Sequence, residues 1–183
     1  MWARLLVART WEMFPSVRGM RRAIAEEVAT SAVLEIGCGF GMNLRHMRGP
    51  YIGLDLDELM MCKARELHPH AEFLAGTVDD HIAALAGIPL VLFSIVLHEL
   101  PPGIRRDVLD AAARTASERI LIFDYNPQMS AFKKWQISLL EEGPLADFWN
   151  FSLADFFHER GWREEGSRPV NHRFYMWRFR KAD

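Results

Sequence analysis

The chain has 183 residues, half of them hydrophobic, and a formal net charge of −2. This length favours a single domain with a substantial core, and the nearly balanced charge does not indicate a nucleic-acid partner. Cys38 and Cys62 are the only cysteines. Because two cysteines are too few for a disulfide framework or a zinc cluster, a cytoplasmic, reduced setting is expected. The opening MWARLLVARTW is too short and too interrupted by arginine for a signal peptide or a membrane span.

In chain order, residues 2–29 are expected to form one or two amphipathic helices, broken near Pro15. Short apolar runs of strand length follow at 32–36, 51–56, 71–75, 90–96 and 119–123. The segments between them have helical patterns at roughly 41–48, 57–67, 79–86 and 103–116. Continuous apolar strands that alternate with helices predict a parallel sheet covered on both faces.

The C-terminal third has a different pattern. Helical patterns around 128–142 and at 152–160 come first, and Gly161 ends the second of these in the position of a helix C-cap. Residues 161–181 are expected to form two strands and a turn. The predicted fold is therefore a doubly wound α/β sandwich, with a mainly parallel seven-stranded sheet, helices on both faces and an antiparallel last strand.

The stretch VLEIGCGFGMNL, residues 33–44, joins the first strand to the next helix through Gly37, Gly39 and Gly41. Glycine permits a positive φ and lets a ligand approach the backbone, and the start of a helix offers unpaired amides. A ligand-binding turn is the main interpretation, and a merely tight strand-to-helix turn is the alternative.

Two carboxylates narrow the choice of ligand. Asp55 ends the second strand, 18 positions after Gly37, where this kind of sheet places an acid against the hydroxyls of a ribose; a helix cap is the alternative, better suited to Asp57. Glu35 would repel a pyrophosphate at the first turn and favours a positively charged ligand such as S-adenosylmethionine. A nicotinamide-dependent dehydrogenase is the rival, disfavoured by Glu35 and by Met42 in place of a further glycine.

Five segments in succession resemble the motifs of class I (Rossmann-like) S-adenosylmethionine-dependent methyltransferases. They are VLEIGCGFG, YIGLDLDELMM, AEFLAGTVDDHIAAL, IPLVLFSIVLHELPPGIRRDVL and ERILIFDYN, and they span about residues 30–126. The resemblance implies that the cofactor-binding residues are Glu35, Gly37, Cys38, Gly39, Asp55, Leu56, Thr77, Val78, Ser94 and Ile95.

The resemblance also implies what each of these residues does. The glycine turn with Cys38 would surround the methionyl portion of S-adenosylmethionine, and Glu35 would act on its ammonium group directly or through water. Leu56, Thr77 and Val78 would contact the adenine. Asp79 would take over the adenine amino group, since Thr77 stands where many members carry an acid. Ser94 and Ile95 would line the methionyl end.

His98 follows the fourth strand, where the family faces the transferred methyl group. It is a candidate general base or substrate contact, and a histidine that packs the loop is the alternative. Asp124 and Asn126 are suitable oxygen ligands for Mg²⁺. The fourth strand ends in Ser94, however, with no acid before Glu99. No metal is therefore predicted, and Asp124 is expected to brace the following loop.

The acceptor is expected to be a small, partly apolar molecule. Nine aromatic residues fall between positions 125 and 162, and with Trp2 and Trp11 they are expected to roof an apolar pocket. The charges of Lys133, Lys134, Glu141, Glu142 and Asp147 nearly balance. The predicted organisation is an N-terminal helical lid (1–29), a cofactor-binding half (30–126) and a substrate-side insertion with a C-terminal hairpin (127–183). RNA or protein methylation and a catalytically silent cofactor-binding domain remain alternatives, and the oligomeric state stays open.

Overall fold

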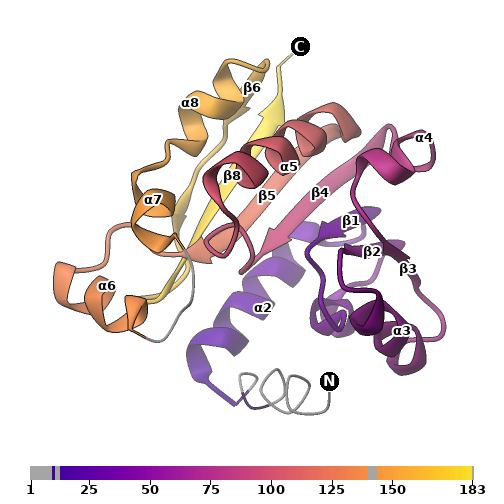
Figure 1. The fold of residues 1–183 in the computed structure, drawn as a ribbon, viewed down its shortest axis with the longest axis horizontal. Coiled ribbons are helices and arrows are strands. Elements are labelled where there is room, and N and C mark those ends of the chain that lie inside the picture. The colour runs from indigo at the N-terminus through magenta and orange to yellow at the C-terminus, as the bar shows by residue number, and fades with distance from the viewer. Residues whose placement is uncertain (1–9, 11–12, 140–143, 183) are drawn as a thin grey trace.

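The computed structural model describes residue 10, residues 13–139 and residues 144–182. It contains an eight-stranded sheet (Figure 1). The strands are β1 (Val33–Ile36), β2 (Tyr51–Asp55), β3 (Glu72–Ala75), β4 (Ile88–Ser94), β5 (Ala116–Tyr125), β6 (Trp162–Glu164), β7 (Arg168–Pro169) and β8 (Phe174–Lys181). The helices are α2 (Pro15–Val28), α3 (Glu58–Leu67), α4 (Ile82–Leu85), α5 (Pro102–Thr115), α6 (Ala131–Ser138), α7 (Leu145–Asn150) and α8 (Leu153–His158). Two 3₁₀ turns, η1 (Met42–His46) and η2 (Asp79–His81), complete the set.

The strand order is β3-β2-β1-β4-β5-β8-β6. The first five strands are parallel, and β8 adds antiparallel to β5. The short strands β6 and β7 both pair with β8. The predicted mainly parallel sheet with an antiparallel last strand is confirmed, and the two-residue strand β7 is an addition to it.

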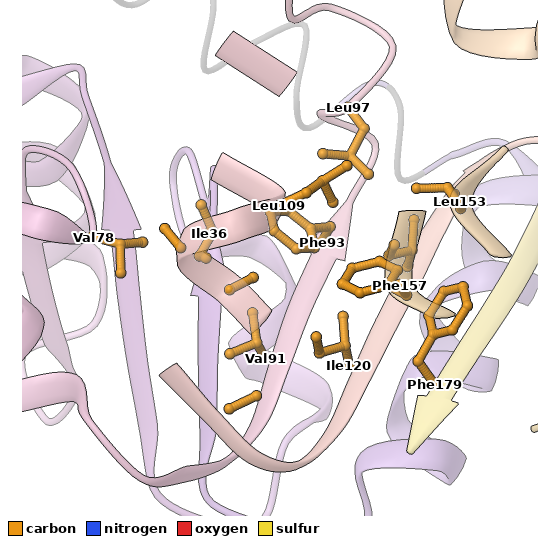
Figure 2. Close-up of a cluster of buried hydrophobic side chains, with 14 of the residues drawn as sticks. Ile36, Val78, Val91, Phe93, Leu97, Leu109, Ile120, Leu153, Phe157 and Phe179 are labelled. Carbon is orange, nitrogen blue, oxygen red and sulfur yellow. The ribbon is translucent and has the colours of Figure 1, made fainter. Parts of the chain in front are cut away.

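Helices cover both faces of the sheet because the central strands are apolar on both sides. In β4, the residues from Leu90 to Phe93 are completely buried. Helix α2 packs on the face of Leu90 and Leu92, whereas α5 and α8 pack on the face of Val91 and Phe93 (Figure 2). The register places the carboxyl ends of β1, β2, β4 and β5 at one edge of the sheet, the edge where open α/β sheets bind ligands.

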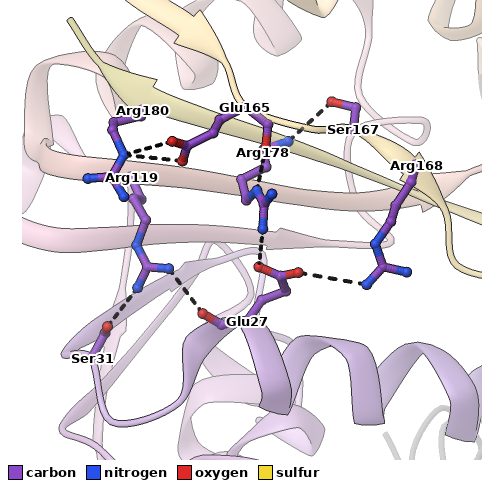
Figure 3. Close-up of polar contacts among 8 residues, drawn as sticks. All are labelled: Glu27, Ser31, Arg119, Glu165, Ser167, Arg168, Arg178 and Arg180. Carbon is purple, nitrogen blue, oxygen red and sulfur yellow. Dashed lines mark hydrogen bonds and ion pairs between the residues drawn. The ribbon is translucent and has the colours of Figure 1, made fainter.

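Helix α2 is also tied to the far end of the sheet by polar contacts (Figure 3). Glu27 accepts a hydrogen bond from Arg178 of β8 at 3.0 Å and lies 3.8 Å from Arg168. Arg119 of β5 donates to the Glu27 carbonyl and to the Ser31 hydroxyl. These contacts hold α2 against the sheet, and α2 contributes a residue to the site described below.

Several predicted elements differ from the observed ones. The helix expected at 41–48 is a five-residue 3₁₀ turn, because three glycines with positive φ (Gly37, Gly39 and Gly41) precede it. The helix expected at 128–142 is the shorter α6, and α7 was not predicted. Trp2 and Trp11 of the predicted lid lie outside the described residues. So do Glu141 and Glu142 of the predicted substrate-side segment. No helix within the described ranges is both long enough and apolar enough to cross a membrane.

Candidate functional site

A cavity of about 1660 Å³ lies at the carboxyl edge of the parallel strands. All the residues predicted as cofactor-binding line it, and so do Asp79 and the candidate base His98. They come from the ends of β1, β2 and β4 and from the loops that follow β3 and β4. The structure therefore brings together residues that the sequence scatters between positions 35 and 98.

The glycine turn is held against β2 by its backbone. The amides of Gly37 and Cys38 donate to the Leu54 carbonyl at 2.8 and 3.2 Å. Gly37 has a φ of 73°, and a Cβ there would lie 2.5 Å from the Val96 side chain. At Gly39 a Cβ would meet only the sulfur of Met60, at 3.9 Å. The backbone at Gly39 is therefore open to a ligand in the cavity.

Asp55 connects the glycine turn to the start of α3. Its Oδ2 accepts from the amide of Gly39 at 2.9 Å, and its Oδ1 accepts from the amide of Asp57 at 3.0 Å. Asp57 itself caps α3 by accepting a hydrogen bond from the Met60 amide at 3.1 Å. The prediction that Asp57 is the helix cap is therefore confirmed. Each oxygen of Asp55 can accept a further hydrogen bond from a ligand hydroxyl.

Glu35 is 2% exposed and lies at the centre of a buried polar chain. Its two oxygens accept from the Tyr51 hydroxyl, at 2.6 Å, and from the Asn43 amide. Asn43 in turn accepts from the guanidinium of Arg21 on α2. Burial raises the pKa of Glu35 to about 6, against the opposing effects of Tyr51, Asn43 and Arg21. Sequence reasoning missed all three partners: Asn43 and Tyr51 lie in the segments 33–44 and 51–61 but were given no role, and Arg21 lies outside every motif.

The segment after β3 forms the other side of the cavity. Thr77 donates from its amide and its hydroxyl to Asp80, at 2.7 Å each, and these bonds lower the pKa of Asp80. Asp79 pairs with Arg114 of α5 at 2.8 Å. Val78 is buried. Leu56 lies on the rim, with 67% of its surface exposed.

The end of β4 combines an unpaired hydroxyl with backbone strain. The Ser94 Oγ is buried and has no hydrogen-bond partner within the described ranges. Ile95 has a φ of 56°, a conformation that costs a branched residue about 1–3 kcal/mol and is concentrated at functional sites. Cys38, by contrast, is a buried small residue whose pKa is raised by burial, so its thiol stays protonated.

His98 is 1% exposed and is oriented by Asp124 at the end of β5. Its Nδ1 lies 2.7 Å from the Asp124 Oδ1, and its Nε2 lies 3.9 Å from the Glu99 carboxylate. Asp124 also accepts from the amides of Leu97, His98 and Tyr125. Because an ionised carboxylate only accepts hydrogen bonds, Nδ1 carries the proton and Nε2 is the basic nitrogen.

The same contacts bear on the metal question. Both oxygens of Asp124 already accept two hydrogen bonds each, so this carboxylate braces the loop after β4, whereas the loop that follows Asp124 itself was expected. A cluster of three or more His, Cys, Asp or Glu side chains suited to a metal ion is not found among the residues that the structure describes.

The walls near His98 differ from the expected aromatic roof. Among the described residues, none between 125 and 162 lines the cavity. Phe148, Phe156, Phe157 and Trp162 pack in the core, while Phe132 and Trp135 are more than half exposed. The cavity is instead closed by Phe14 and Arg21 from the N-terminal side and by Arg173 just before β8. For the described aromatic residues of 125–162 the predicted roof was wrong, because they pack the short helices on the sheet or lie exposed; the part of the prediction that used Trp2 and Trp11 lies outside the described residues.

Comparisons with known proteins agree with this arrangement. A family model described as a methyltransferase domain matches residues 33–119. A search of the curated proteins finds no match to the sequence. Among solved structures, the magnesium protoporphyrin IX methyltransferase of Synechocystis PCC 6803 with bound SAH has a TM-score of 0.65 at 14% identity, with 91% of this chain and 84% of that chain covered.

Two further structures extend the likeness. The mitomycin 7-O-methyltransferase MmcR has a TM-score of 0.71 at 21% identity, with 98% of this chain and 57% of that chain covered. A TehB-like SAM-dependent methyltransferase from Corynebacterium glutamicum has a TM-score of 0.65 at 16% identity, and 96% of each chain is covered. At these identities the structures show a shared fold.

Proposed function

We propose that this chain is a class I S-adenosylmethionine-dependent methyltransferase, supported by the matching methyltransferase-domain model and the shared fold, and that it methylates a small, partly apolar molecule in the cavity beside His98. The observation that carries the proposal is the cavity itself, which continues from the glycine turn past Ser94 to the His98–Asp124 pair. S-adenosylmethionine is the cofactor, and it supplies an electrophilic methyl group on a sulfonium. The residues of the chain position the two reactants.

We propose the cofactor contacts from the geometry of the lining residues. Asp55 would accept from the ribose hydroxyls, since each of its oxygens has a remaining lone pair beside the cavity. Gly37, Cys38 and Gly39 would follow the methionyl chain, with Ser94 and Ile95 facing them from β4. Leu56, Thr77, Val78 and Asp79 would surround the adenine. This set supports a ligand with one sugar, one base and one amino-acid tail.

The hydrogen-bonded series Arg21–Asn43–Glu35 is suited to bind the charged methionyl tail of the cofactor. Glu35 would stabilise the ammonium group, directly or through water, and a cation beside it raises the ionised fraction of a carboxyl whose pKa is about 6. Arg21 also lines the cavity and is the cation at this end, where it would meet the tail carboxylate. The two charges of the tail would thus face two charges of the protein.

His98 would take the proton of the attacking group. His98 lines the cavity and Asp124 holds the Nδ1 side of its ring, which leaves Nε2 as the basic nitrogen, and the Asp124 carboxylate stabilises the imidazolium that forms. Methyl transfer depends mainly on in-line positioning, and a general base adds to the rate when the attacking heteroatom carries a proton. A hydroxyl or amine acceptor fits this arrangement.

A small acceptor is supported by the nature of the walls. Phe14, Ile95, Val96 and Leu100 are apolar, and pockets for small molecules are typically lined by apolar residues with few polar groups. Two of the structural neighbours are named for small molecules, a protoporphyrin and a mitomycin. We further propose the division into a lid (1–29), a cofactor half (30–126) and a substrate side (127–183), and a cytoplasmic setting, which rests on two unpaired cysteines.

Two measurements test the proposal. Calorimetric titration should show binding of S-adenosylhomocysteine and no binding of NADH. Incubation with methyl-labelled S-adenosylmethionine and fractionated cell extract should then place the label in the small-molecule fraction. Label in the RNA or protein fraction would favour the alternative acceptors, and cofactor binding without any transfer would indicate a catalytically silent domain.

A further inference from the structure

The geometry points to an acceptor that carries a carboxylate, with Arg173 as the residue that binds it. This inference rests on the proposed function, because it assigns the second substrate of the same cavity. It names a substrate class, an apolar hydroxy or amino acid, and a residue that lies far from every motif of the sequence.

The sheet places Arg173 beside the reacting region. Phe174, the first residue of β8, pairs with Tyr125, the last residue of β5. The amide of Asn126 donates to the Arg173 carbonyl at 2.9 Å. Arg173 is therefore at the carboxyl edge of the parallel strands, next to the segment after β5, and it lines the cavity together with His98.

The loop that carries Arg173 is fixed in place. Asn171 accepts from the amides of Arg173 and Phe174, at 2.9 and 3.0 Å. Its side-chain amide donates to the Ser16 carbonyl on α2 at 2.9 Å. A guanidinium on such a loop is preorganised, which lowers the entropy cost of binding a ligand.

Arg173 and His98 share one aromatic ring. The guanidinium carbon of Arg173 lies 5.6 Å from the centre of the Tyr125 ring, and the His98 ring lies 4.7 Å from the same centre in an edge-to-face arrangement. Tyr125 is completely buried. One small molecule can therefore reach both groups, with its acid on the planar fork of Arg173 and its attacking heteroatom at His98.

The other charges of the cavity agree with this placement. Of the three arginines that line it, Arg114, beside Asp79, and Arg21, beside Asn43, lie toward the proposed cofactor side, whereas Arg173 lies at the start of β8. Glu99 lies 3.9 Å from the Nε2 of His98 and is 59% exposed. Repulsion from Glu99 would keep an anionic group of the acceptor away from this carboxylate.

The test uses 1-hydroxy-2-naphthoate and its neutral analogue 1-hydroxy-2-naphthamide, which differ in charge and hardly in shape. Their fluorescence reports binding to the full chain saturated with S-adenosylhomocysteine. We expect the acid to bind at least about tenfold more tightly than the amide, since a charged hydrogen bond between its carboxylate and Arg173 contributes that much. Arg173→Met should remove this preference and leave amide binding unchanged, and Arg173→Lys should keep part of it.

The matched control is Arg168→Met, which removes an exposed arginine of β7 outside the cavity and should keep the full preference. Equal binding of acid and amide, binding of neither, or a preference that survives Arg173→Met would overturn the inference. The wild-type comparison stands even if a variant does not fold. Calorimetry with S-adenosylhomocysteine alone separates the two proposals: absence of that binding contradicts the proposed function, whereas its presence without acid preference contradicts only this inference.

Discussion

The two ends of the cavity are built in different ways. The cofactor end comes from consecutive strand ends, so that Glu35, Gly37 and Asp55 are close in sequence as well as in space. The acceptor end joins α2 to the start of β8, and one bond in it, from Asn171 to Ser16, connects positions 155 apart. The first end is a set of local turns on a parallel sheet, and the second exists only when the whole chain has folded.

This difference separates binding from chemistry. Changes at the cofactor end should alter cofactor affinity or stability, because its groups either face the ligand or hold the turns. Changes at the acceptor end should alter turnover and leave the cofactor bound. The four predictions below test this separation, beginning with the largest expected effect.

His98→Gln should lower kcat about 100-fold or more, the range by which a general base contributes, with S-adenosylhomocysteine affinity unchanged. The assay is turnover of the acceptor identified by the labelling experiment, together with calorimetry. The acid limb of the pH profile of kcat/KM should disappear as well. Glu99→Gln is the control, since this exposed neighbour at 3.9 Å should leave that limb in place. Unchanged turnover would make His98 a packing residue.

Gly37→Ala should lower the free energy of unfolding by about 2–4 kcal/mol, because it adds a strained φ and a clash with Val96. Gly87→Ala separates these causes. Its φ of 78° is similar, but nothing lies within 4 Å of the added carbon, so it should cost only about 1–2 kcal/mol. Urea unfolding of both variants gives the comparison, and equal losses would contradict the clash.

Asp55→Ala should weaken S-adenosylhomocysteine binding by about 1.5–3 kcal/mol through loss of charged hydrogen bonds. It also frees the amide of Gly39, so the glycine turn loses its brace. Calorimetry gives the affinity, and Asp107→Ala is the control, since it removes a carboxylate of the same cavity that has no proposed cofactor contact. An unchanged affinity would contradict the ribose assignment and would leave Asp55 with a purely structural role.

Most of the fold could be predicted from the sequence because the central strands are short, apolar and separated by helices of ordinary length. The cofactor end of the cavity could be predicted from the sequence for the same reason. A glycine turn such as 37–41 and an acid such as Asp55 act within one strand-to-helix connection, where spacing alone fixes the geometry. The structure places all of these residues in one cavity.

The acceptor end of the cavity could not be predicted from the sequence in this way. Arg173 stands in a segment without a motif, and only the pairing of β8 with β5 brings it to the cavity. The aromatic residues of the region 125–162 suggested a pocket, but aromatic side chains pack a core as readily as they line a site. Trp135 is 56% exposed and Phe157 is fully buried, and nothing in their spacing distinguishes the two.

The smallest expected effect concerns the pH dependence of stability at Glu35. Burial raises its pKa from 4.5 to about 6, so the folded state binds a proton more tightly than the unfolded state does. The free energy of unfolding therefore contains a contribution that is fully present below pH 4.5 and is lost as the pH rises to about 6. The loss corresponds to about 2 kcal/mol.

The measurement is urea unfolding of the wild type and of Glu35→Gln between pH 4 and 7. Other carboxylates titrate in the same range and affect both proteins alike, so the difference between the two isolates Glu35. The stability of Glu35→Gln relative to the wild type should rise by about 2 kcal/mol across this window. Tyr51→Phe removes the hydroxyl that donates to Glu35 at 2.6 Å and stabilises its ionised form. In this variant the decline in stability should therefore extend to higher pH than in the wild type.

A difference between the wild type and Glu35→Gln that does not change with pH would contradict a buried, proton-binding carboxyl. Since a bound ammonium would favour the ionised form, saturation with S-adenosylhomocysteine should shift the same decline to lower pH, and this shift connects the stability of the turn to the ligand that the turn is proposed to hold.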